Sequence, residues 1–187
     1  MKKITKTILA SSALLFAFAV NAQTETADVT LNVKLKGIHT ITVNPAQTAV
    51  DLVYDTEAKY SAGVKLLQED HLEIFSTGGF QVTASSSVDD IDNTVANGSH
   101  GSIAANTITI SALEGTTKPI TSSPKPSYST GVALSKTGST IVSYNKGAAR
   151  KGINIEYGGG DSYLDYYVKD QGTSIYQTTV TYTLTAQ

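Results

Sequence analysis

The feature that most limits the fold is an alternation of apolar and polar residues, repeated in short runs from residue 27 to the end of the chain. A period of two places neighbouring side chains on opposite faces of a β-strand, so each run predicts a strand with one buried face. After residue 22 no ten-residue stretch has the spacing of an amphipathic helix, and at most one short helical turn is expected between residues 55 and 70. The pattern therefore predicts an all-β fold.

The predicted strands are short and follow one another closely. They number roughly ten and cover residues 27–36, 38–43, 50–54, 71–76, 80–85, 107–113, 132–134, 140–144, 152–157, 163–168 and 174–185. The connections are too short for crossover helices, so the strands must pair mostly antiparallel. This spacing is typical of a sandwich or a barrel.

Three connections have distinct compositions. Gly78 and Gly79 separate two predicted strands, which is the signature of a hairpin. Residues 86–106 are mostly small and polar and predict a long surface connection. Residues 114–131 contain three of the four prolines. Because proline fixes φ and lacks an amide donor, we expect an exposed, partly polyproline-like loop there.

The N-terminus has the pattern of a secretory signal peptide. Three lysines lie among the first six residues, an apolar run covers residues 8–20, and Val20-Asn21-Ala22 supplies a cleavage pattern. A transmembrane helix needs about 20 apolar residues and no segment is that long, so none is expected. We expect removal of residues 1–22, with residues 23–187 forming a single β-sandwich domain in the periplasm, at the cell surface or outside the cell.

Cleavage would leave 11 basic and 16 acidic side chains, a net charge of −5 in place of −2. An acidic surface without basic clusters repels phosphate backbones, so nucleic acid is not expected as a partner. The sequence contains no cysteine. That composition excludes a disulfide framework, a thiol nucleophile and a cysteine-ligated zinc site.

Two segments resemble bacterial surface proteins. Residues 175–185, Ile-Tyr-Gln-Thr-Thr-Val-Thr-Tyr-Thr-Leu-Thr, resemble the closing strand of surface β-sandwiches such as pilin-like subunits and WxL-type cell-wall proteins. Residues 72–84, two strands around Thr77-Gly78-Gly79-Phe80, are similar to the central hairpin of the same group. The resemblance implies an immunoglobulin-like antiparallel β-sandwich with a non-enzymatic role at or beyond the outer surface.

The first predicted strand raises the question of assembly. Val29, Leu31, Val33 and Leu35 occupy one face of a strictly alternating segment close to the expected new N-terminus. Such a segment can insert into the sheet of a neighbouring molecule, where its backbone forms hydrogen bonds and its alternate side chains fill pockets. It can equally be the first strand of its own domain. We favour the second alternative, because domains normally cover their apolar edge strands.

Two further clusters are candidates for binding. Tyr163, Tyr166 and Tyr167 belong to a tyrosine-rich C-terminal third, where exposed rings can stack on sugars; packing within a sheet is the alternative that we favour. Asp89, Asp90 and Asp92 offer oxygen ligands that suit calcium, although their spacing is not that of an EF-hand. A solvated acidic loop is the favoured interpretation, so we expect no cofactor, with calcium as the alternative.

No catalytic signature is present. The histidines at positions 39, 71 and 100 are isolated in sequence and are expected at the surface or at strand ends. A hydrolase would require them to meet carboxylates in space. The prediction is therefore a secreted, non-enzymatic surface structural or adhesive protein, with a pilin-like polymer subunit as one form. Its partners would be further copies or other surface proteins. The alternative is a carbohydrate- or peptidoglycan-binding module of the cell envelope.

Overall fold

The computed structural model describes residues 25–94, 101–169 and 172–187. The chain divides into two units, residues 1–35 and residues 36–187. In the first unit, residues 25–35 contain neither helix nor strand. The predicted signal peptide lies outside the described residues.

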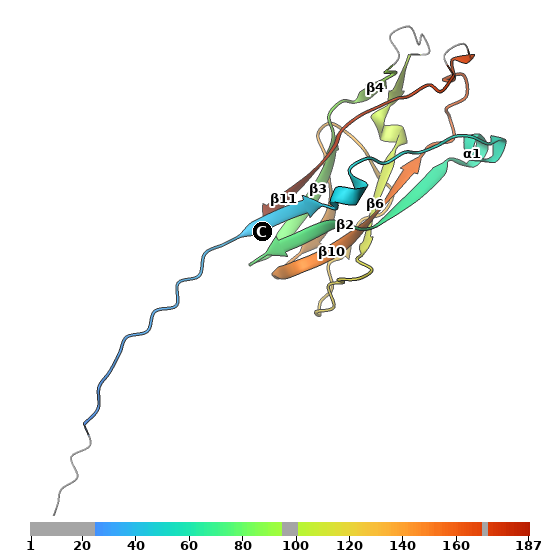
Figure 1. The fold of residues 1–187 in the computed structure, drawn as a ribbon. Coiled ribbons are helices and arrows are strands. Elements are labelled where there is room, and N and C mark those ends of the chain that lie inside the picture. The colour runs from blue at the N-terminus through green and yellow to red at the C-terminus, as the bar shows by residue number, and fades with distance from the viewer. Residues whose placement is uncertain (1–24, 95–100, 170–171) are drawn as a thin grey trace, which may run out of the picture. The chain divides into compact units, whose positions relative to one another are not determined.

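The described part of the second unit consists mainly of strands (Figure 1). The strands are β1 (His39–Val43), β2 (Val64–Ser76), β3 (Phe80–Ser86), β4 (Asp90–Asp92), β5 (Ser102–Ala104), β6 (Thr109–Glu114), β7 (Ser127–Tyr128), β8 (Val132–Ala133), β9 (Ser139–Tyr144), β10 (Ala148–Gly159) and β11 (Val180–Ala186). One helix, α1 (Glu57–Ala62), and two 3₁₀ turns, η1 (Pro45–Gln47) and η2 (Ala105–Thr107), accompany them. The helix is the single short helical segment expected between residues 55 and 70.

Hydrogen bonds join most of the strands into two main sheets. One sheet has five strands in the order β1-β2-β10-β6-β8, and the other has four in the order β11-β3-β9-β7. The strands β4 and β5 form a separate two-stranded sheet. Every pairing between these strands is antiparallel. The prediction of an all-β antiparallel fold is confirmed.

A shared hydrophobic core connects the two main sheets. Its fully buried members include Leu72, Ile74, Ile153 and Ile155 from the five-stranded sheet and Phe80, Val82 and Ile141 from the four-stranded sheet. Along β3 buried residues occupy every second position, as the alternation predicted. Full burial of such a side chain stabilises a fold by about 1.5–3 kcal/mol, so these residues contribute much of the driving force for folding.

The hairpin predicted around Gly78 and Gly79 is wrong. The strand β2 ends just before these glycines and β3 begins directly after them, but β2 pairs with β1 and β10, whereas β3 pairs with β9 and β11. The connection therefore carries the chain from one sheet to the other. The alternation showed that each strand has an apolar face, but it did not show whether those faces lie side by side or oppose each other across a core.

The two predicted loops contain more structure than expected. Residues 86–106 include β4 and β5, where Ile91 pairs with Ile103 and the two side chains are 1% and 9% exposed. In residues 114–131, β7 is present and the Ile120 side chain is buried in the main core. Single isoleucines in otherwise polar segments give no periodic signal, although each buries a large apolar area.

Three predicted strands are wrong. Residues 27–36, 50–54 and 163–168 form no strand. The last strand starts at Val180, later than predicted. Val50 and Leu52 nevertheless pack against the main core. Their alternation therefore reflects one-sided packing without ladder hydrogen bonds.

Strand register defines two ends of the second unit. His39, Ser76, Phe80 and the C-terminal residues of β11 meet at one end, which we call the base. The start of β2 pairs with the end of β10, and the start of β11 pairs with the end of β3, at the opposite end, which we call the tip. The chain enters the second unit at the base, because His39 is the first residue of β1.

Candidate functional site

The first candidate is the N-terminal segment itself. Val29, Leu31, Val33 and Leu35 are 89%, 85%, 75% and 90% exposed. The expectation that residues 27–36 form the first strand of their own domain is therefore wrong for the described structure. These four large apolar side chains are exposed to water and are spaced to share one face of a strand, yet residues 25–35 form no strand. Their burial against another surface would be favourable by about 1.5–3 kcal/mol each.

The second candidate is the free edge of the four-stranded sheet. The strands at the ends of the two main sheets are β1, β8, β11 and β7. Of these, β11 has seven residues, β1 has five, and β7 and β8 have two each. Among the strands of the described residues, β11 thus offers the longest edge for the addition of a further strand.

The hydrogen bonds of β11 show which backbone groups are turned outward. The amide of Ser87 donates to the carbonyl of Thr179, and the amide of Gln187 donates to the carbonyl of Gly79, each at 2.9 Å. In an antiparallel ladder the bonded residues alternate, so the odd-numbered residues of β11 face β3. The amide and carbonyl groups of the even-numbered residues, from Val180 to Ala186, therefore point toward the free edge.

The core is incompletely covered along this edge. Val180, Tyr182 and Leu184 pack against the main core but are only half-buried. The same is true of Ile41 on β1, a strand that lies beside β11. A strand added along β11 would therefore meet backbone donors and acceptors together with apolar side chains that water still reaches.

A chain of hydrogen bonds reaches this edge from inside the core. Gln47 donates through Nε2 to the Glu69 carbonyl (3.1 Å), which fixes its Oε1 as the acceptor for His71 Nδ1 (2.9 Å). The Nε2 atom of His71 therefore accepts from the Tyr157 hydroxyl (2.9 Å), which accepts from Tyr182 (2.6 Å). Tyr182 belongs to β11, so this series of hydrogen bonds connects the two main sheets.

The position of His71 corrects an expectation. Sequence reasoning placed it at the surface or at a strand end, whereas its side chain is 2% exposed. Burial lowers the pKa of His71 and keeps the ring neutral. Burial also raises the pKa values of Tyr157 and Tyr182. The group is a neutral structural network. His39 bonds to Ser76 at 2.8 Å, and His100 lies outside the described residues.

A second polar centre surrounds Asp70, which sequence reasoning missed. The carboxylate accepts from the amides of Thr116 (3.0 Å) and Thr117 (2.9 Å) and from the Thr117 hydroxyl (2.5 Å). Buried Asn154 accepts from the Asp70 amide at 2.6 Å. Burial alone would raise the pKa of Asp70, but these hydrogen bonds and the nearby Lys118 charge hold it below its usual range. The centre fastens the chain after β6 to β2 and β10.

The predicted tyrosine site is mostly an interior cluster. Tyr163 is 8% exposed, and its hydroxyl bonds to Thr107 Oγ1 at 2.6 Å. Its ring centroid lies 5.1 Å from Tyr54 and 6.3 Å from Tyr166. Tyr167 is 52% exposed. The structure thus brings Tyr163 and Tyr166 together at the tip, where Ile91 and Ile103 complete the cluster.

The aspartates predicted as an acidic loop lie on and beside β4. Asp90 and Asp92 begin and end this strand with exposed side chains, and Asp89 Oδ1 accepts from the Lys136 amide at 2.9 Å. Within residues 25–94, 101–169 and 172–187, no group of three or more histidine, aspartate or glutamate side chains is placed to hold a metal ion.

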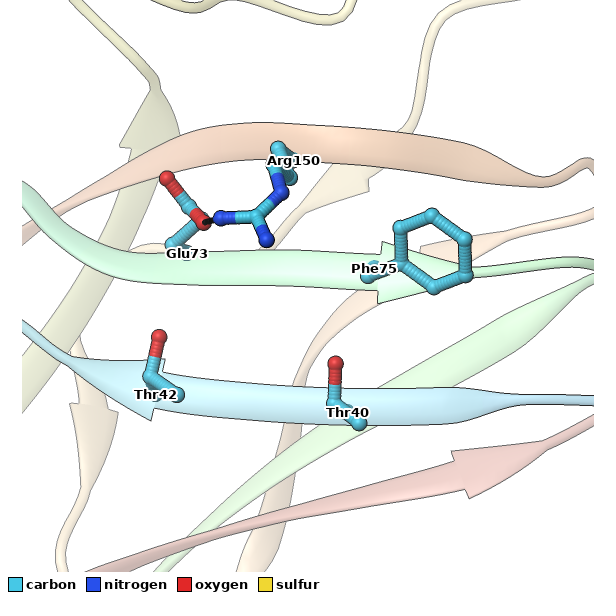
Figure 2. A pocket seen from close by; sticks show the side chains of 5 residues that line it. All are labelled: Thr40, Thr42, Glu73, Phe75 and Arg150. Atoms are coloured by element: carbon cyan, nitrogen blue, oxygen red, sulfur yellow. Dashed lines mark hydrogen bonds and ion pairs between the residues drawn. The ribbon is translucent and has the colours of Figure 1, made fainter.

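A shallow hollow of about 330 Å³ is found on the outer face of β1, β2 and β10 (Figure 2). It is lined by Thr40, Thr42, Glu73, Phe75 and Arg150. Glu73 pairs with Arg150 at 3.4 Å and with Lys118 at 2.7 Å. The hydrogen bond and charge of Lys118, followed by the charge of Arg150, lower the pKa of Glu73. Sequence reasoning missed this group because its residues come from three separate strands.

No helix in the described part of the chain has the length and hydrophobicity that crossing a membrane requires. In comparisons with known proteins, no family model and no curated protein matches the chain.

Proposed function

We propose that this chain is an exported, non-enzymatic structural protein of the cell surface that assembles with further copies of itself through its N-terminal segment. The second unit serves as an immunoglobulin-like β-sandwich body, and the signal peptide predicted at residues 1–22 directs export. The observation that carries the proposal is the exposure of Val29, Leu31, Val33 and Leu35 on an unpaired, strictly alternating segment.

The energetics favour a partner for this segment. Water contact with four aliphatic side chains is unfavourable, and addition to a sheet edge relieves it while the backbone gains ladder hydrogen bonds. The ordering of each residue costs about 1–2 kcal/mol of backbone entropy, so the apolar face must supply a large share of the gain. Assembly should therefore depend on the apolar positions and tolerate changes at the polar positions between them.

A pair of double variants tests the proposal. In L31D/V33D two charges replace apolar side chains, and we expect assemblies to disappear, because a buried unpaired carboxylate costs several kcal/mol. In the matched control T30D/N32D the same two charges lie on the opposite face, and assembly should persist. The measurement is sedimentation velocity and negative-stain electron microscopy of protein purified after export.

Three results would contradict the proposal. The protein could remain monomeric at every concentration tested, or both double variants could assemble as the unmodified chain does. Retention of the protein in the cytoplasm with residues 1–22 intact would also contradict it. Circular dichroism of each variant checks that the second unit is folded. We expect it to be folded, because all four substituted positions lie in residues 25–35, which contain no helix or strand.

A glycan-binding module of the cell envelope is the second candidate function, and the hollow in Figure 2 favours it. Phe75 offers a ring face for a sugar, and the two threonine hydroxyls, Glu73 and Arg150 offer hydrogen bonds. If this function holds, Phe75→Ala should lower retention on insoluble peptidoglycan at least tenfold. Ile175→Ala, at an exposed apolar side chain outside the hollow, is the control and should change retention less than twofold. Equal retention of both variants would exclude the hollow as the binding site.

A further inference from the structure

We infer that the hollow in Figure 2 recognises a sugar that bears a carboxylate, such as a hexuronate unit of an acidic polysaccharide, and that Arg150 is the group that binds the anion. The inference rests on the second candidate function, glycan binding, and names the chemical class of the ligand. It is carried by the backbone at Arg150 and by the weak contacts of its side chain.

Arg150 lies in a β-bulge beside the hollow. The register of β10 on β2 shifts between residues 148 and 151, so two residues of β10, Ala149 and Arg150, stand opposite one residue of β2, Phe75. Bulges of this kind redirect a side chain and are frequent beside functional sites. The φ of Arg150 is 49°, a left-handed conformation that is unfavourable for residues other than glycine. The bulge therefore places an arginine at the hollow although its backbone is strained.

The strained arginine returns little stability to the fold. Its side chain is 79% exposed, and its ion pair with Glu73 Oε1 is 3.4 Å long. Glu73 has a closer partner, because Lys118 Nζ lies 2.7 Å from its Oε2. Exposed pairs such as these contribute almost nothing to stability. Among the described residues no other group bonds to the Arg150 guanidinium, so most of its N–H donors can bind a ligand.

The chemistry of the guanidinium favours a carboxylate. Its planar fork donates two parallel hydrogen bonds to a carboxylate, whereas a neutral hydroxyl cannot accept both. Glu73 stays ionised and paired with Lys118, whose hydrogen bond and charge lower the pKa of the Glu73 carboxyl. The net charge of the chain is −2, but distant charges are largely screened beyond about 8 Å at physiological ionic strength. The groups at the hollow therefore decide which ligand is accepted.

The neighbouring residues suit the rest of a sugar ring. Thr40 stands opposite Phe75 and Thr42 stands opposite Glu73, on adjacent strands about 4.8 Å apart. The half-buried Phe75 ring offers an apolar face to the C–H groups of a sugar, and the threonine hydroxyls can donate to or accept from its hydroxyls. A volume of about 330 Å³ is small for a ligand site, so the hollow suits a short stretch of a polysaccharide.

Two forms of one polymer test the inference. Polygalacturonate and its fully methyl-esterified form have the same sugar ring and differ in the charge of the carboxyl group. The full chain should bind immobilised polygalacturonate about tenfold more tightly than the ester, as measured by biolayer interferometry.

Three variants assign the charge selection to Arg150. Arg150→Ala should lower the affinity for polygalacturonate about tenfold. Arg150→Lys should lower it about threefold, because an ammonium keeps the charge but lacks the paired donors. The matched control Lys65→Ala removes an exposed positive charge from β2 outside the hollow and should change the affinity less than about twofold. Circular dichroism checks that each variant is folded.

The contrary outcomes separate this inference from the function on which it rests. Equal binding of the two polymers, lost in Phe75→Ala, would overturn charge selection and leave glycan binding at the hollow. Equal losses in Arg150→Ala and Lys65→Ala, or binding of dextran sulfate that Arg150→Ala leaves unchanged, would show a general attraction of polyanions and overturn the site. Failure to bind either polymer, while Phe75→Ala still loses peptidoglycan retention, would overturn the carboxylate assignment alone. Failure of both measurements would overturn glycan binding itself.

Discussion

Replacement of His71 by alanine should lower the free energy of unfolding by about 4 kcal/mol at pH 7.5. The substitution leaves a cavity in the core, which costs about 2–5 kcal/mol for a large side chain. It also removes the hydrogen-bond partners of Gln47 and Tyr157 and the ring contacts to Tyr157 and Tyr182, whose centroids lie 5.6 and 5.8 Å away. Urea unfolding followed by circular dichroism provides the measurement.

The same residue should make stability depend on pH. Because burial lowers the pKa of His71 in the folded state, the unfolded chain binds a proton below about pH 6.5 while the folded chain does not. The contribution of the neutral His71 ring to the free energy of unfolding is therefore complete above pH 6.5. It declines as the pH falls, at up to about 1.4 kcal/mol per pH unit. Protonation of Nε2 would also leave the Tyr157 hydroxyl without its acceptor.

Two comparisons isolate this effect. The decline between pH 6.5 and 5 should disappear from the His71→Ala variant. It should persist in Tyr182→Phe, which loses one hydroxyl and about 1 kcal/mol but keeps the imidazole. A parallel decline in the unmodified chain and in His71→Ala would show that another group is responsible.

The second large effect is expected from Asp70→Ala, which should lower the free energy of unfolding by about 3 kcal/mol at pH 7. Hydrogen bonds to a charged group stabilise by about 1.5–3 kcal/mol each, and the carboxylate accepts three, from Thr116 and Thr117. Water can reach these exposed threonines after the substitution, so the total is less than three full bonds. The backbone of Asp70 also has a φ of 45°, which aspartate tolerates better than alanine.

The conservative variant Asp70→Asn keeps one acceptor oxygen and should lose about half as much. Because the folded-state pKa of Asp70 is lowered, its contribution is present above about pH 4 and is lost as the pH falls through the folded value. The stability difference between the unmodified chain and Asp70→Ala should therefore narrow below pH 4. A difference that is constant from pH 7 to pH 3 would contradict a role for the charged carboxylate.

The period-two pattern was sufficient to predict the fold class and most strands, because alternation directly reflects a buried and an exposed strand face. It predicted β3 and β11 without showing which sheet each joins. Pairing is decided by contacts distant in sequence, and this explains why the hairpin at Gly78 and Gly79 was predicted where the chain crosses between sheets. It also explains why the Val29 to Leu35 segment was assigned to its own domain.

The polar centres could not have been predicted from spacing. His71 and Tyr157 are 86 residues apart, and Asp70 and Thr117 are 47 apart. Neither pair forms a local motif, and each becomes visible only once the register of β2 and β10 is known. Sequence grouped Tyr163, Tyr166 and Tyr167 as exposed binding residues, whereas Tyr163 is buried, and sequence carried no signal that Tyr54 packs against Tyr163.

The place where the chain enters the second unit has a mechanical consequence. The N-terminal segment is followed by β1, which begins at the base and is held by β2 through five antiparallel residue pairs. In the proposed assembly, a neighbour that holds residues 25–35 would pull on β1 from its first residue, His39. A load directed along β1 would shear all the hydrogen bonds of this ladder at once instead of breaking them one by one. The proposed assembly would therefore resist stretching far better than sideways peeling.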